Sequence, residues 1–155
     1  KRKYKIFYVL KLDISKYFYC IDHEVLKGLL IDKLDDYEYN IVSEIIDTTN
    51  KEYINKTINK LKEDRDIPNY LYGKGLPIGN MTSQFLSIYY LYKLDYFIVH
   101  DLGLKYYIRY MDDFIILDSD LEKLKEAKEK IKSRDRKVRK RKKYGYFCLN
   151  VIRIK

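Results

Sequence analysis

The spacing of apolar and polar residues predicts a β-strand near the beginning of the chain. Residues 5–14 are rich in β-branched and aromatic side chains, and the last part of this run alternates between two faces. One face is apolar and consists of Leu10, Leu12 and Ile14. The other face carries Val9, Lys11 and Asp13. A two-residue period with one apolar side is typical of a strand that covers a hydrophobic core.

Three helices are predicted to follow this strand. Asp22 is expected to cap a helix from His23 to Leu30, because its side chain can accept hydrogen bonds from the first free backbone N–H groups. Asp36 is expected to cap a second helix, which residues 48–50 end. The apolar stripe of that helix consists of Ile41, Val42, Ile45 and Ile46. Residues 51–66 are mostly polar and predict a marginal helix.

A loop of special conformation and a buried helix are predicted next. Residues 67–80 hold both prolines and three of the six glycines, which favours a loop. Residues 82–100 are apolar nearly all round, so we expect one long buried helix that stops at residues 101–103. The side chains expected inside are Phe85, Leu86, Ile88, Leu91 and Leu94.

Two strand-like runs then flank a short polar break. The run KYYIRY-MDD-FIILD at residues 105–118 predicts a β-hairpin. Ser119 and Glu122 have the spacing of a capping box, which predicts a charged helix to about Ile131. No helical or strand period continues beyond Lys132. The fold class predicted from these elements is α+β, with an antiparallel sheet and helices on one of its faces.

Charge and composition narrow the function classes. A chain of 155 residues suits one domain, and its net charge of +9 arises in residues 121–143, which hold 13 basic and 4 acidic side chains. Such a segment attracts polyanions, nucleic acid first, although a solvated tail is the simpler alternative. Two cysteines form no disulfide framework, which favours a reducing cytoplasm. No membrane span or signal peptide is predicted.

The candidate chemistry lies at the tip of the predicted hairpin. Asp112 and Asp113 are adjacent carboxylates, which repel each other unless a cation lies between them. Asp13 ends the first predicted strand and would join them if that strand lies beside the hairpin. Three carboxylates could hold two Mg²⁺ ions roughly 4 Å apart, the arrangement used for in-line phosphoryl transfer. Aspartate is also a common turn residue, so the pair alone is a weak signal.

The order of these motifs resembles a reverse transcriptase over roughly residues 5–131. YVLKLDISKYFYCIDH is similar to the first palm motif of that family, and YIRYMDDFIIL is similar to its Tyr-x-Asp-Asp catalytic hairpin. GKGLPIGNMTSQFLSIYYLYKLD is similar to the loop and helix that hold template and nucleotide. Its Ile-Gly-x-x-x-Ser-Gln pattern resembles the enzymes of diversity-generating retroelements, whereas most of the family reads Gln-Gly-x-x-x-Ser-Pro there.

The resemblance implies a role for each matching residue. Asp13, Asp112 and Asp113 would be the catalytic metal ligands, together with the backbone carbonyl of Ile14. The residues that would bind the incoming dNTP are Lys16, Tyr17, Phe18, Tyr110 and Met111. Lys16 and Tyr17 would do so through their backbone, and the Phe18 ring would exclude a ribose 2′-hydroxyl. The template and nucleotide loop would use Ile78, Gly79, Ser83 and Gln84.

The resemblance also implies cofactors, partners and domain organisation. Two Mg²⁺ ions, with Mn²⁺ as the substitute, would act on an RNA template, a DNA primer and dNTPs, with an accessory protein as a further partner and no membrane. The enzyme would be cytoplasmic and encoded by a bacterial or phage retroelement. Residues 1–131 would form the palm with a fingers-side helical insert at about 23–75. Residues 132–155 match no thumb and predict an unassigned basic tail, with a shifted reading frame as one explanation.

Two other functions stay open on the sequence. A truncated, inactive remnant could bind nucleic acid through the basic segment, and we expect the isolated chain to be inactive if the fingers and thumb are missing. A metal-dependent phosphodiesterase could use the same carboxylates. His23 is expected on the surface or at a helix N-terminus, without a catalytic role.

Overall fold

The computed structural model describes the backbone of residues 7–61, 67–141 and 149–154, and side chains through residue 134. The chain divides into two compact units, residues 16–90 and the combination of 1–15 with 91–155. Each unit is described by itself. The insert predicted at about 23–75 lies inside the first of these units, whereas both halves of the predicted carboxylate site lie in the second.

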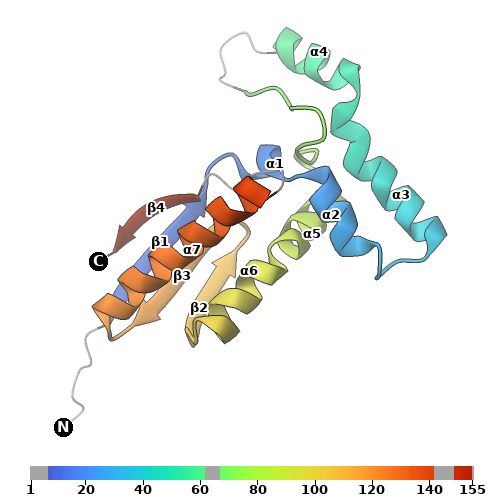
Figure 1. Cartoon of the computed structure of the whole chain (residues 1–155). Helices are drawn as coiled ribbons and strands as arrows, with labels where there is room; N and C mark the ends of the chain where they lie inside the picture. Colours follow the sequence, from blue (N-terminus) through green and yellow to red (C-terminus); the bar gives the residue numbers. More distant parts are fainter. Residues whose placement is uncertain (1–6, 62–66, 142–148, 155) are drawn as a thin grey trace. The chain divides into compact units, whose positions relative to one another are not determined.

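The second unit contains one antiparallel β-sheet (Figure 1). Its strands are β1 (Tyr8–Ile14), β2 (Tyr106–Tyr110), β3 (Asp113–Asp118) and β4 (Leu149–Ile154), in the spatial order β2-β3-β1-β4. The predicted α+β class and the predicted hairpin are confirmed. The more specific prediction of a reverse transcriptase palm is not tested by this topology.

One face of the sheet forms the core of this unit. Leu12 pairs with Phe114 and Leu10 pairs with Ile116, and all four side chains are buried as the alternation predicts. Helix α7 (Leu121–Arg141) packs on this face against β1 and β3 (Figure 1). Its buried side chains are Leu124, Ala127 and Ile131.

Helix α7 differs from its prediction at both ends. Its first turn is capped by Asp120, whose carboxylate accepts from the backbone N–H groups of Glu122 and Lys123 at 2.9 and 3.2 Å, and not by Ser119. The helix also continues past Ile131 to Arg141. A basic run without an apolar period can extend a helix because lysine and arginine have high helix propensity. The predicted basic tail therefore includes helical residues and strand β4.

The predicted helix over residues 82–100 is divided. Helix α5 (Met81–Tyr90) belongs to the unit of residues 16–90, whereas α6 (Tyr92–Tyr96) and the π-helical turn η2 (Phe97–Asp101) belong to the other unit. Leu91 lies between α5 and α6 and has φ −91° and ψ −3°. Gly103 takes a positive φ of 62°, and the segment stops there as predicted.

The burial expected for this segment is only partly right. Leu86, Leu91 and Leu94 are buried, but Phe85 and Ile88 are 67% and 46% exposed. Apolar residues on all sides of a helix therefore did not indicate burial on all sides. One stripe of α5 faces the open side of an apolar hollow described below.

The unit of residues 16–90 is helical. Its elements are α1 (Tyr17–Cys20), α2 (His23–Leu30), α3 (Asp36–Ile46), η1 (Asp47–Asn50), α4 (Glu52–Leu61) and α5. Asp22 caps α2 as predicted, accepting from the backbone N–H of Val25 at 3.1 Å. Helix α3 is capped by Asp35 and not by Asp36, because Asp35 and Glu38 form a reciprocal capping box.

His23 is the first residue of α2, so the predicted helix N-terminus is confirmed, but its side chain is buried and does not lie on the surface. Its Nε2 lies 2.7 Å from the carbonyl oxygen of Gly75, and its Nδ1 lies 3.1 Å from Oδ1 of Asp47. The imidazole thus joins α2, η1 and the glycine-rich loop. This position is structural, because a histidine at a helix start can turn its ring inward when buried oxygens need a partner.

Candidate active site

The hairpin between β2 and β3 places two of the predicted carboxylates at its tip. Tyr110 pairs with Asp113, so Met111 and Asp112 form a two-residue turn. Met111 has a positive φ of 53°, a conformation that a side chain other than glycine adopts at a cost. Lys16, three residues after Asp13, also has a positive φ, of 52°. Backbone strain of this kind often accompanies functional sites.

Asp13 lies next to this hairpin in the sheet. The antiparallel register that pairs Leu12 with Phe114 leads, one step further, to Asp13 opposite Asp113. Opposed residues point to the same face, and this face is the one opposite the core. The sheet therefore brings together two aspartates that are far apart in the sequence.

The electrostatics of Asp112 show that all three carboxylates interact. Partial burial raises the pKa of Asp112, and the negative charges of Asp13 and Asp113 raise it further. Neighbouring carboxylates that repel one another when ionised are stabilised by a bound cation. The predicted meeting of Asp13 with the hairpin tip is consistent with this coupling.

Lys11 supplies part of the compensating charge. Its Nζ lies 3.4 Å from Oδ1 of Asp113, and both side chains are about half exposed. Lys11 and Asp13 occupy the same face of β1 because they are two residues apart. An ammonium group therefore stands beside the carboxylate of Asp113.

Arg109 is a residue of this site that the sequence analysis did not identify. Its guanidinium donates to both carboxylate oxygens of Asp95 in α6, at 2.8 and 2.5 Å, and also to the carbonyl oxygen of Met111 at 2.9 Å. Tyr107 donates to the same Asp95 at 2.5 Å. A signal was present in the sequence, because strand alternation places Arg109 on the core face, where a charged group needs a buried partner.

The donor chemistry of the carboxylates suits a hard divalent cation. In the part of the chain that the structure describes, no three histidine, cysteine, aspartate or glutamate side chains form a ready-made cluster around one point. Magnesium does not require such a cage, because it commonly takes one or two protein carboxylates and fills its shell with water and phosphate oxygens. Asp13, Asp112 and Asp113 supply carboxylates on β1 and at the neighbouring hairpin tip.

The face of the sheet around the carboxylates carries exposed aromatic and aliphatic groups. On β2 the outward side chains are Tyr106, Ile108 and Tyr110, which are 61%, 67% and 77% exposed. The ring of Phe7 packs edge-on against Tyr106 at 6.1 Å. Large exposed apolar groups on one face often mark a binding surface.

The predicted nucleotide-binding residues Lys16, Tyr17 and Phe18 lie in the helical unit. The Tyr17 side chain is buried, and its hydroxyl donates to the carbonyl oxygen of Ser87 at 2.5 Å. The Phe18 ring packs edge-on against Tyr17 with ring centres 5.8 Å apart. Tyr17 can therefore offer a ligand only its backbone, which agrees with the role implied for it.

The predicted template loop is partly exposed and partly buried. Ile78 is 61% exposed, and Gly79 has a φ of 90° with open space where a Cβ would lie. Gln84 is exposed, whereas Ser83 is fully buried and its hydroxyl has no hydrogen-bond partner. Ser83 is thus a core residue of this unit. Of the four predicted loop residues, only Ile78, Gly79 and Gln84 are exposed.

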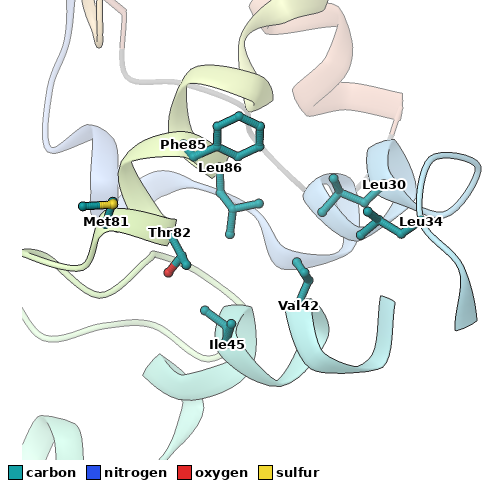
Figure 2. Close-up of a pocket in the computed structure, with 8 residues that line it drawn as sticks. All are labelled: Leu30, Leu34, Val42, Ile45, Met81, Thr82, Phe85 and Leu86. Atoms are coloured by element: carbon teal, nitrogen blue, oxygen red, sulfur yellow. The ribbon is translucent and has the colours of Figure 1, made fainter. Parts of the chain in front are cut away.

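An apolar hollow of about 360 Å³ lies in the same helical unit (Figure 2). Side chains of α2, α3 and α5 and of the turn after α2 line it: Leu30, Leu34, Val42, Ile45, Met81, Thr82, Phe85 and Leu86. Thr82 lines it with its apolar atoms, so the lining surface is wholly apolar. The hollow explains the exposure of Phe85, but it contains no charged group with which to perform chemistry.

Comparison with known proteins leaves the family open. No protein-family model matches the chain, and no curated protein is significantly similar to it. Within residues 7–61, 67–141 and 149–154, no helix combines the length and apolar character that crossing a bilayer requires.

Proposed function

We propose that the chain is the catalytic core of an RNA-directed DNA polymerase. The observation that carries the proposal is the strand register, which places Asp13 of β1 opposite Asp113 at the tip of the β2–β3 hairpin, with Asp112 in the turn. Burial raises the pKa of Asp112, and the charges of Asp13 and Asp113 raise it further, which supports the same placement. This arrangement occurs in a chain whose three motifs follow the order of a reverse transcriptase. The partners proposed with this function are an RNA template, a DNA primer and dNTPs.

The proposed reaction is attack of the primer 3′-hydroxyl on the α-phosphate of a dNTP. Bound Mg²⁺ would lower the pKa of the hydroxyl and stabilise the triphosphate and pyrophosphate. Asp13, Asp112 and Asp113, with the carbonyl oxygen of Ile14, are the groups proposed to hold it. The backbone at Lys16 and Tyr17 and the ring of Phe18 are proposed to bind the nucleotide.

The exposed face of the sheet supports the same assignment. Tyr106, Ile108 and Tyr110 lie on the side of the sheet that carries Asp13 and Asp113. Aromatic and aliphatic side chains can pack against the bases and sugars of a nucleic acid without reading its sequence. A substrate on this face would lie beside the carboxylates.

The first experiment measures metal binding and activity in one pair of variants. Asp112→Asn keeps the side-chain shape but removes a metal ligand, so Mn²⁺ binding followed by electron paramagnetic resonance should weaken at least roughly tenfold. Primer extension on an RNA template should fall by roughly a thousandfold or more. Asp118→Asn is the matched control, because Asp118 lies at the other end of β3 and pairs with Lys123. Both readouts should be unchanged in that control.

The alternatives give different results in the same assays. Equal Mn²⁺ affinity in wild type and Asp112→Asn would refute the metal role. Mn²⁺ binding at Asp112 together with RNA binding, but without extension, would favour the inactive remnant. Cleavage of RNA in the absence of dNTPs, lost in Asp112→Asn, would instead favour a phosphodiesterase.

A further inference from the structure

We propose that Arg109 is a positioning residue that fixes the hairpin turn carrying Asp112, by connecting the carbonyl oxygen of Met111 to Asp95 of α6. The part of this inference that concerns metal binding at Asp112 rests on the proposed function. Its structural part concerns the turn itself and can be tested without a metal or a substrate.

The anchor of this connection is an ion pair with two hydrogen bonds. Nε and Nη2 of Arg109 lie 2.8 and 2.5 Å from Oδ1 and Oδ2 of Asp95. The Arg109 side chain is 9% exposed and the Asp95 side chain is 28% exposed. A bidentate guanidinium–carboxylate pair at this depth fixes the orientation of the guanidinium plane.

The remaining arm of the guanidinium reaches the turn. Nη1 of Arg109 donates to the carbonyl oxygen of Met111 at 2.9 Å. That carbonyl belongs to the peptide bond between Met111 and Asp112, so its orientation affects where the Asp112 side chain begins. Because Met111 has a φ of 53°, the turn costs conformational energy that this contact can offset.

Tyr107 can serve as a control for Arg109, because both side chains donate to Asp95. Its hydroxyl donates to Oδ1 of Asp95, and burial followed by the contact with Asp95 raises the pKa of Tyr107 far above its usual range. Tyr107 therefore remains a donor to Asp95 at physiological pH. Its hydroxyl donates to Asp95, whereas the guanidinium of Arg109 donates to both Asp95 and the carbonyl oxygen of Met111.

The structural part is tested in the metal-free protein by hydrogen exchange. Arg109→Lys keeps the positive charge but a single ammonium group cannot hold both oxygens of Asp95 and the Met111 carbonyl. The amides of Asp112 and Asp113 should exchange at least roughly tenfold faster in Arg109→Lys than in Tyr107→Phe. Equal exchange in the two variants, at similar loss of global stability, would overturn the positioning role.

The catalytic part is tested by Mn²⁺ affinity and by a rescue. Loss of a group that orients a ligand typically weakens metal binding 10- to 100-fold. We therefore expect roughly tenfold weaker Mn²⁺ binding in Arg109→Lys and no change in Tyr107→Phe. Met111→Gly removes the cost of the positive φ, so the double variant Arg109→Lys/Met111→Gly should regain most of the affinity.

The two failures can be told apart. If wild type binds no Mn²⁺ through Asp112, the proposed function fails, while the exchange experiment still decides the positioning role. If Asp112 binds Mn²⁺ and Tyr107→Phe weakens it as much as Arg109→Lys does, the effect is general loosening and the inference is wrong. Absence of rescue in the double variant would also contradict it.

Discussion

At the scale of single residues, the charge of Lys11 decides how easily the carboxylates accept a cation. The Nζ of Lys11 lies 3.4 Å from Oδ1 of Asp113. A surface ion pair of this exposure contributes at most about 1 kcal/mol to stability. Its larger effect concerns ligands, because a divalent cation must approach against the charge of the ammonium group.

Lys11→Met is expected to bind Mn²⁺ more tightly. Removal of one positive charge at an exposed site should increase the affinity by roughly threefold at low ionic strength, and less at high salt. The measurement is a Mn²⁺ titration by electron paramagnetic resonance. Lys123→Met, which removes the partner of Asp118 at the other end of β3, is the control. Weaker binding in Lys11→Met would show that Lys11 supports the metal site and does not compete with it.

Single residues were predictable where their role is local. Asp22 caps α2 because a cap depends on groups three residues apart, which the sequence displays. The partners of Arg109 and His23 could not be predicted, because Asp95, Asp47 and Gly75 come from other elements. The sequence shows that a buried charge needs a partner, but not which residue supplies it.

At the scale of elements, the glycine-rich loop depends on a close contact at Gly75. A Cβ at this position would lie 2.5 Å from Cδ1 of the Tyr70 ring, and Gly75 also has a positive φ of 86°. Tyr70 cannot easily move away, because its hydroxyl donates to the carbonyl oxygen of Leu76 at 3.0 Å. Burial, followed by the neighbouring Tyr19, raises the pKa of Tyr70 to about 12, so this donor keeps its proton.

Gly75→Ala should therefore destabilise the chain much more than Gly79→Ala. Both positions have a positive φ, which costs alanine about 1–2 kcal/mol. Only the alanine at position 75 also clashes with the Tyr70 ring, so Gly75→Ala should lower the free energy of unfolding by about 2–4 kcal/mol in total. Urea unfolding followed by circular dichroism gives both free energies. Similar losses at the two glycines would show that the Tyr70 contact does not constrain the loop.

Most elements were predictable, and the exceptions have a physical cause. The hairpin at residues 106–118 and the strand at 8–14 follow from alternation alone. The division of the helix over residues 82–100 was not predictable, because the apolar period continues through Leu91, where α5 has ended and α6 has not yet begun. Periodicity reports which side chains are apolar, and neighbouring elements decide how many of them are covered.

At the scale of the whole molecule, we expect the carboxylates to make stability depend on pH, and the proposed metal binding would add a dependence on divalent ions. In the folded state the pKa of Asp112 is raised above its ordinary value of 3.8. Between the ordinary pKa and the raised pKa, the folded state therefore holds more protons than the unfolded state. Stability contributed through Asp112 therefore falls as pH rises through that window. At neutral pH its charge is a net cost to folding.

Asp112→Asn should be slightly more stable than wild type at neutral pH without divalent ions. The gain should stay under about 1 kcal/mol, because Asp112 is only partly buried and solvent screens its charge. Saturating Mn²⁺ at 100 times its Kd should stabilise wild type by about 2.7 kcal/mol and the variant by much less. Thermal unfolding at several pH values provides the measurement.

In the same experiment, Asp118→Asn should change the stability at neutral pH in the opposite direction. The hydrogen bond from Lys123 lowers the pKa of Asp118, so its contribution is present above the ordinary carboxyl pKa and is lost as pH falls. This variant should be less stable at neutral pH. A lower stability of Asp112→Asn than of wild type at neutral pH would contradict the repulsion among the three carboxylates.

The order of strands in the sheet has a consequence for how the chain folds during synthesis. Strand β1 is made before its partners, because Tyr8 pairs with Asp118 and Leu10 with Ile154, so those partners emerge from the ribosome more than about 100 residues later. Until then its apolar face and both of its hydrogen-bonding edges are exposed. The nascent chain thus carries an unpaired apolar strand until those partners are made, a state that chaperones commonly protect.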